Sequence, residues 1–221
     1  MPVTQAIIDA LQTFDPEFIW DAKAGRYKWA SNGRYLSREA MLNLTRRQID
    51  QTKRDLATLG NLLTDHKISL ATWQEETARA LKSLHIRQAI LARGGVDKMV
   101  ANDYLTIART LKEEYGYLRN FAGDIADQGM SKAQFEARLS MYADKSRVSW
   151  ELANRQNFVD NGYSMMERQL GATDRHCGDC LRYASLGPQP IGWVPMPTQG
   201  CICRARCKCV VKYHKFSDLL P

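Results

Sequence analysis

The cysteines of this chain are confined to a short C-terminal stretch, and this placement constrains the fold more than any other feature. The 221-residue sequence contains six cysteines, and no cysteine occurs before residue 177. A Cys-x2-Cys pair opens the stretch and a Cys-x-Cys-x3-Cys-x-Cys run closes it, which places the thiols at Cys177, Cys180, Cys201, Cys203, Cys207 and Cys209. Such clustering indicates one local site.

Metal binding is the chemistry that this spacing favours. Two thiolates at Cys-x2-Cys spacing can bind the same tetrahedral ion, and a second pair on a returning segment completes the four ligands that zinc takes. Because the six cysteines exceed this number, at least two are spare if a single ion binds. Disulfides, a redox-dependent mixture and buried free thiols are the alternatives.

A metal staple in this region has a physical reason. Glycines and prolines recur between Gly171 and Gly200, which is typical of a turn-rich module. A module of about 55 residues buries too little apolar surface to hold a unique fold comfortably by itself. Packing against the rest of the chain is the competing source of stability.

The middle of the chain has the pattern of helices separated by stop signals. Apolar residues recur at helical spacing in four segments, at about residues 37–63, 70–92, 102–127 and 131–152. Ser37 is the predicted N-cap of the first segment, and Gly94-Gly95 ends the second. Ser131, followed three residues later by Gln134, forms a capping-box pattern before the fourth.

These patterns predict a mainly α fold, with an elongated helical body and a small cysteine-rich C-terminal α+β module of short strands and a β-hairpin. The predicted divisions are an irregular, hairpin-containing segment over 1–36, the helical body over 37–160 and the cysteine-rich, basic module over 161–221. The stretch from Thr45 to Asp55 has only one strongly apolar residue, Ile49. The first helix therefore lies on an outer face or packs against a partner in an assembly.

The first 36 residues predict a short apolar helix around Ala6–Leu11, followed by a hairpin. Asn32-Gly33 suits the positive φ angles of a tight turn between two short strands. The hairpin would carry three aromatic side chains, Tyr27, Trp29 and Tyr35. They either cover the end of a helix of the same chain or form a docking surface for another chain.

A basic segment follows the cysteine pattern, and the formal net charge of the chain is +7. The segment contains no acidic residue, and its basic residues are Arg204, Arg206, Lys208, Lys212 and Lys215. If Cys203–Lys212 forms a strand, residues 204, 206 and 208 point away from the cysteine face. These basic side chains would form a ridge that suits DNA phosphates, an acidic protein surface or solvent. Because the sequence has no base-reading motif, any DNA contact is expected to be independent of the DNA sequence.

Membrane-spanning and secreted classes do not fit the composition. The mean hydropathy is −0.43, and no apolar run reaches the roughly 20 residues of a transmembrane helix. The N-terminus lacks a basic segment followed by an apolar one. We therefore expect a protein made in the cytosol, without a membrane partner.

An enzyme is not expected either. His66 and His85 are predicted at surface or boundary positions, without an acidic or cysteine companion. Asp174, His176 and Cys177 are near neighbours that could supply a thiol nucleophile and its base. Residues adjacent in sequence seldom point at each other productively, so no catalytic residues are assigned.

Six segments, in this order, resemble the phage head morphogenesis, or minor head protein, family. The first three are YKWASNGRYLS from Tyr27, ISLATW from Ile68 and YLRNF from Tyr117. The C-terminal three are HCGDCLRYA, PQPIGWVPMP and CRARCKCVVKY. Together they cover most of the chain from about residue 25 to residue 214.

The resemblance implies a minor structural protein of a tailed-phage virion that acts in head assembly at or near the portal vertex. Its expected partners are portal and capsid proteins and, non-specifically, packaged DNA, with several copies in an assembly. It is expected in the virion and, during assembly, in the host cytoplasm. The resemblance leaves Cys201 as an additional cysteine, so one structural zinc ion is expected on four of Cys177, Cys180, Cys203, Cys207 and Cys209. The alternative function is a zinc-stapled protein that binds nucleic acid independently of sequence.

Overall fold

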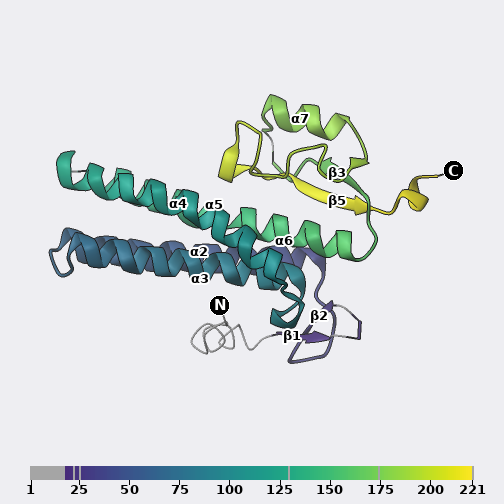
Figure 1. Cartoon of the computed structure of the whole chain (residues 1–221), viewed down its shortest axis with the longest axis horizontal. Coiled ribbons are helices and arrows are strands. Elements are labelled where there is room, and N and C mark those ends of the chain that lie inside the picture. Colours follow the sequence, from purple (N-terminus) through teal and green to yellow (C-terminus); the bar gives the residue numbers. More distant parts are fainter. Residues whose placement is uncertain (1–17, 22, 25, 129, 174, 221) are drawn as a thin grey trace.

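The computed structural model describes residues 18–21, 23–24, 26–128, 130–173 and 175–220, and these residues form a mainly helical fold. An elongated layer of helices makes up most of the molecule, and a small module with short strands and one short helix lies along one side of it (Figure 1). A two-stranded hairpin lies on the opposite side of the layer (Figure 1). The predicted fold class is therefore confirmed. The predicted helix at Ala6–Leu11 lies outside the described residues.

Five long helices in the described residues form the body: α2 (Arg38–Thr64), α3 (Leu70–Arg93), α4 (Ala101–Gln128), α5 (Lys132–Lys145) and α6 (Arg147–Asp160). The predicted caps are present. Ser37 accepts a hydrogen bond from the Ala40 N–H, and Ser131 with Gln134 forms the capping box of α5. Gly94 ends α3 at a φ of 89°, where a residue without a Cβ is least strained. A 3-10 turn, η1 (Val96–Lys98), leads to α4.

The predicted fourth helix is wrong in one respect, because it is two helices that meet at Ser146. The Ser146 side chain is fully buried and its Oγ donates to the carbonyl oxygen of Ala143 over 2.7 Å. Its backbone N–H also turns back to Ala143 and Asp144. A hydroxyl that bonds back to its own helix competes with the regular ladder and bends the chain. The break directs α6 along α3, with which it packs most extensively.

An aromatic cluster holds the body together where α2, α3, α4 and α5 meet. Trp73 lies edge-on to Phe121, with ring centroids 5.5 Å apart, and both side chains are completely buried. Phe135 lies 5.5 Å from Trp73 and 5.4 Å from Phe121. Such contacts add stability beyond the burial of apolar area.

Gly60 of α2 allows α5 to approach this cluster. A Cβ at Gly60 would overlap the Phe135 ring and lie 3.4 Å from Leu139 Cδ1. Gly60→Ala is expected to lower the free energy of unfolding by about 1–3 kcal/mol through overpacking. Urea denaturation measures this change. The control is Gly123→Ala in α4, where no atom lies within 4 Å of the added Cβ; it should stabilise by up to about 1 kcal/mol, and equal effects of the two changes would contradict the packing.

The C-terminal module consists of a three-stranded antiparallel sheet with the order β4-β3-β5 and a short helix, α7. The bounds are β3 (Met165–Gln169), α7 (Gly178–Ser185), β4 (Gln189–Pro190) and β5 (Val210–His214), with 3-10 turns η2 (Arg204–Arg206) and η3 (Phe216–Leu219). The side chains buried within it form a small core of their own: Met166, Val194, Met196, Val211 and Tyr213. Gly171 permits the close packing of the chain after β3, since a Cβ there would overlap the carbonyl group of Lys208.

The N-terminal hairpin pairs β1 (Phe18–Asp21) with β2 (Arg26–Trp29) in antiparallel register. The predicted turn at Asn32-Gly33 is also present. Gly33 has a φ of +67°, and a single bridge joins Lys28 to Tyr35 beyond it. β2 thus lies between two neighbouring segments.

Candidate metal centre

The cysteines come together from two segments of the module. Cys177 occupies the N-cap position of α7, and Cys180 lies buried in its first turn. The second segment runs through η2 towards β5. Cys177 and Cys203 are half-buried and pack against a buried sulfur cluster that consists of Cys180, Cys201, Cys207 and Cys209.

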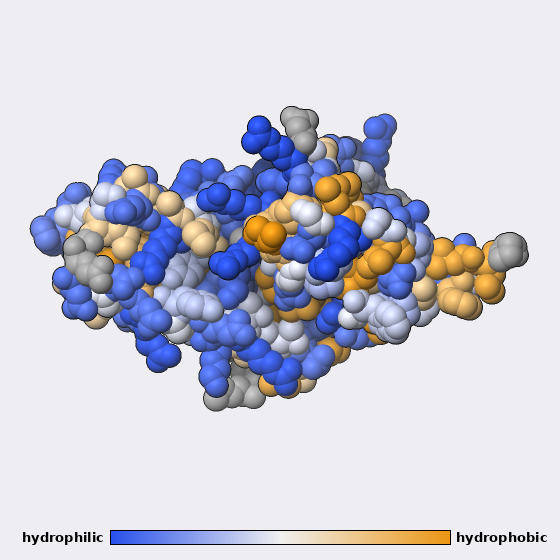
Figure 2. Space-filling model, turned by 90° about the horizontal axis from the view of Figure 1, so that it is seen from above, coloured by the Kyte–Doolittle hydropathy of each residue, from blue (hydrophilic) through white to orange (hydrophobic). Residues whose placement is uncertain are grey.

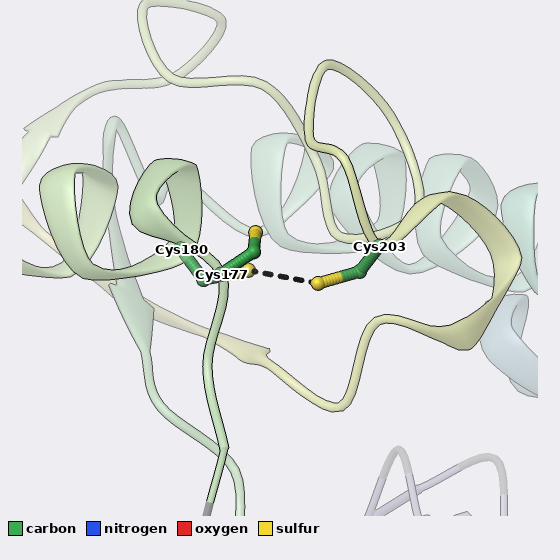
Figure 3. Close-up of side chains that lie close together, drawn as sticks. All are labelled: Cys177, Cys180 and Cys203. Atoms are coloured by element: carbon green, nitrogen blue, oxygen red, sulfur yellow. Dashed lines mark hydrogen bonds between the residues drawn. The ribbon is translucent and has the colours of Figure 1, made fainter.

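The sulfur atoms form two groups that share Cys180. In the first group, the sulfurs of Cys177, Cys180 and Cys203 all lie within 4.8 Å of one another. In the second, the same holds for Cys180, Cys207 and Cys209. Figure 3 shows Cys177 and Cys180 at the start of α7 on one side and Cys203 of the second segment on the other, with the Cys180–Cys203 contact dashed.

The spacing of these sulfurs fits zinc. Cys180 Sγ lies 3.8 Å from Cys203 Sγ and 3.7 Å from Cys207 Sγ. Four sulfurs around a zinc ion at about 2.3 Å are about 3.8 Å apart along each edge of the tetrahedron. These cysteines can therefore hold a metal ion, and their soft thiolate ligands suit zinc among the common ions. The predicted candidates Cys177, Cys180, Cys203, Cys207 and Cys209 are the residues brought together.

A buried cation borders the sulfurs. Arg168 on β3 is 1% exposed, and its Nη2 lies 3.5 Å from Cys180 Sγ and 3.3 Å from Cys207 Sγ. Its Nη1 donates to the carbonyl oxygen of Pro195 over 2.9 Å. A buried charge without an anion nearby is unfavourable. The negative charge of a metal–thiolate centre would offset that of Arg168, which supports the fit of the site to a metal.

The thiols of the first group differ in acidity. The backbone N–H of Cys180 and the thiol of Cys203 lower the pKa of Cys177 to about 6. The thiol of Cys177 in turn raises the pKa of Cys203, and burial raises the pKa of Cys180. The pKa of a cysteine is commonly lowered when the residue lies at the start of a helix.

In the second group, Cys207 is the acidified thiol. Burial opposes its ionisation, but backbone hydrogen bonds from Thr198 and Cys209, together with the charge of Arg168, lower the pKa of Cys207. Each group thus contains one thiol that readily becomes a metal-binding thiolate.

The difference in acidity predicts selective alkylation of the metal-free, reduced protein. Because the thiolate is the nucleophile, iodoacetamide should label Cys177 at a rate that rises through pH of about 6 and levels off above it. Cys203, whose pKa is raised, is the internal control and should still react slowly at pH 7. Peptide mass spectrometry after timed labelling measures both rates, and equal rates at pH 7 would contradict this order.

The cysteine segment is clamped to the helical body by Arg147. Its guanidinium, at the start of α6, donates to the carbonyl oxygens of Cys207 and Cys209. Nη2 also lies 3.2 Å from Glu151, which is 2% exposed. These hydrogen bonds therefore attach the cysteine segment directly to α6.

The predicted strand over Cys203–Lys212 is wrong in its first half. Arg204–Arg206 form the 3-10 turn η2, and β5 begins only at Val210. Arg204 has a φ of +46°, which an extended strand cannot accommodate. The expected outward direction of the basic side chains nevertheless holds, because all of them are exposed: Arg204, Arg206, Lys208, Lys212 and Lys215.

Arg204 also borders a groove of about 840 Å³ between the module and helices α4, α5 and α6. Three further basic side chains line it, Arg109, Arg138 and Lys145. Its walls include the exposed apolar side chains of Tyr117 and Met141. Glu113 also lines the groove and lies 3.7 Å from Lys145, and Arg138 is paired with Asp124. The groove thus combines a surplus of basic side chains with apolar surface.

The three predicted docking aromatics occupy different environments. Tyr27 is 8% exposed and packs with Leu36, Leu44 and Leu91, while Trp29 is half-buried against the same cluster. These two rings cover the helices of their own chain. Tyr35 is 43% exposed, and its hydroxyl donates to Asp21 over 3.2 Å.

A polar chain in the body was missed from the sequence. His66 is exposed as expected, but the expectation for His85 is wrong, because it is completely buried. Its Nε2 lies 2.8 Å from Glu114 Oε2 and its Nδ1 lies 2.8 Å from Ser149 Oγ. These three polar side chains connect α3, α4 and α6. All three are buried from solvent, so they act in stability.

The module also exposes apolar side chains that the sequence did not single out. Trp193 and Ile202 are 77% and 78% exposed. Figure 2 shows hydrophobic patches over the module and at the C-terminal projection, whereas the far end of the helical layer is mostly hydrophilic. Trp193 lies in the PQPIGWVPMP segment, whose prolines and glycine signal an exposed turn.

Comparison with known proteins found no matching family model, no matching curated protein and no matching solved structure. The resemblance to minor head proteins therefore stays a prediction from the quoted segments. Within the described residues, the helices are too short or too polar to span a bilayer.

Proposed function

We propose that this chain is a minor structural protein of a tailed-phage virion that acts in head assembly at or near the portal vertex. The observation that carries the proposal is a thiol-built module, clamped to a long helical body by Arg147, that keeps basic and apolar side chains on its outside. This arrangement suits a protein that joins partners. The six segments that resemble minor head proteins, in their order along the chain, are the reason for proposing a phage head as the assembly.

In this proposal the cysteines hold structural zinc and no catalytic residue is assigned. Zinc stabilises the turn-rich module and so fixes the positions of its outward residues, among them Arg204 and Trp193. Portal and capsid proteins are the partners, and several copies act together in the virion, having been made in the host cytoplasm. The groove beside Arg204 suits an acidic partner segment with apolar side chains.

A direct test uses the phage itself. A premature stop codon in the gene should reduce the yield of infectious, DNA-filled heads, and expression of the intact chain from a plasmid should restore it. Mass spectrometry of purified virions should detect the chain at a small fraction of the major capsid protein. The proposal would be overturned if the phage with the stop codon reached full titre and the chain were absent from virions of the unchanged phage.

The second candidate is sequence-independent binding to nucleic acid, and the exposed basic residues favour it. Among the described residues, none of Arg204, Arg206, Lys208 and Lys212 forms an ion pair with a carboxylate. If these four and Lys215 all contact phosphates, affinity should fall roughly 500-fold between 50 and 200 mM salt. Gel shifts at the two salt concentrations with unrelated DNA sequences test it. Weak DNA binding at both salt concentrations would contradict this second function, and the assembly function would be the one that remains.

A further inference from the structure

We infer that the module holds two metal ions rather than one, with the thiolate of Cys180 bridging them. The inference rests on the proposal that the module binds zinc and specifies the centre further. The first ion lies among Cys177, Cys180 and Cys203, and the second among Cys180, Cys207 and Cys209.

The width of the sulfur cluster is the first argument. One zinc ion that is held by four thiolates needs four sulfurs that are all about 3.8 Å apart. Within the described residues, the sulfurs that lie within 4.8 Å of one another form two sets of three, and no fourth ligand joins either set. The sulfurs thus offer two separate places for an ion, one in each set of three, rather than one set of four.

The position of Cys180 is the second argument. It is the only member common to both sets, and its Sγ lies at a tetrahedral edge length from one sulfur of each: 3.8 Å from Cys203 and 3.7 Å from Cys207. A sulfur that belongs to two tetrahedra at once occupies this position. Its 1% exposure is also that of a ligand at the centre of a cluster.

The number of cysteines is the third argument. A single ion with four thiolate ligands leaves two of the six thiols without a metal partner, whereas two ions that share Cys180 use five of them. Cys201 is 7% exposed in the same sulfur cluster but belongs to neither set. The first ion would lie beside Cys177 and Cys203, which are half-buried, so water would have access to complete its coordination.

The charge of the surroundings agrees with this centre. Five thiolates on two zinc ions carry a net negative charge, and Arg168 donates towards Cys180 and Cys207 from a buried position. Hydrogen bonds to ligand sulfurs are a common way to stabilise such clusters. Arg168 thus faces the bridging sulfur and one ligand of the second ion.

Native mass spectrometry of the full chain, purified with zinc under reducing conditions, counts the ions directly. The expected mass excess is two zinc ions in the unchanged protein. Cys203→Ser should retain one ion, at the second position, and Cys209→Ser should retain one ion, at the first. The control His176→Ala changes a potential ligand that belongs to neither set and should retain both ions.

The outcomes separate this inference from the proposed zinc module. One ion in the unchanged protein would overturn the two-ion centre and leave the zinc module intact, whereas no ion would overturn both. Two ions that persist in Cys203→Ser would contradict the assignment of ligands. Because the helical body contains no cysteine, its far-ultraviolet circular dichroism shows whether the body of each variant stays folded. Titration with Co²⁺, followed by the absorption of the cobalt–thiolate bonds, counts the bound ions a second time in solution.

Discussion

Replacing Cys180 with serine is expected to abolish metal binding and to unfold the C-terminal module, while the helical body stays folded. Cys180 belongs to both sulfur groups, so its loss leaves neither with three thiols. Structural zinc contributes apparent binding free energies on the order of 10–16 kcal/mol in small metal-dependent domains. The module's own core of five buried side chains is too small to replace a contribution of this size.

Hydrogen exchange with mass spectrometry resolves the two parts of the molecule in this experiment. In Cys180→Ser, peptides from β3 to β5 should lose protection to the level of an unfolded chain, and peptides from α2, α3 and α4 should keep theirs. The control Ser185→Ala changes an exposed residue of the same helix and should match the unchanged protein. Full protection of the module in metal-free Cys180→Ser would contradict a metal staple.

Glu114→Ala is expected to lower the free energy of unfolding by about 1–3 kcal/mol, the cost of leaving a buried polar group of His85 without its partner, with a further loss from the cavity that the removed side chain leaves. Glu114 and His85 are both completely buried, with Oε2 and Nε2 2.8 Å apart. Without the carboxylate, the imidazole keeps only the Ser149 hydroxyl as a polar neighbour on its other nitrogen. The change also removes a contact between α3 and α4.

The neighbouring Glu113 provides a matched control. Its side chain is 72% exposed and lies 3.7 Å from Lys145, so Glu113→Ala should change the free energy of unfolding by less than about 1 kcal/mol. Urea denaturation of both variants measures the difference. The double change His85→Leu with Glu114→Leu should recover much of the loss, since apolar residues of similar volume often replace a buried pair without cost. Equal small effects of Glu113→Ala and Glu114→Ala would contradict the buried pair.

The parts of this fold that the sequence predicted are those encoded by local signals. Ser37, Ser131 with Gln134, and Gly94 act on the backbone within a few residues, so the ends of α2, α3 and α5 follow from short patterns. The break at Ser146 did not follow, because a serine inside a helix bends it only when its hydroxyl is buried and turned back.

Features that depend on packing between distant segments could not be predicted. His85 and Glu114 lie 29 positions apart in sequence, and only the packing of α3 against α4 aligns them. Cysteine spacing indicated a thiol site, but the division of the sulfurs around Cys180 depends on η2, which sequence alternation assigned to a strand. The role of Arg168 could not be predicted either, because its contacts with the cysteine sulfurs form only after the chain has folded.

Zinc K-edge X-ray absorption spectroscopy of the purified full chain is the most direct test of the metal-held module. A sulfur-dominated first shell at about 2.3 Å from the metal is the predicted result, and the two-ion centre adds a metal–metal contribution beyond it. A protein that is folded through β5 and shows no zinc edge, or a first shell of nitrogen and oxygen alone, would contradict the central claim.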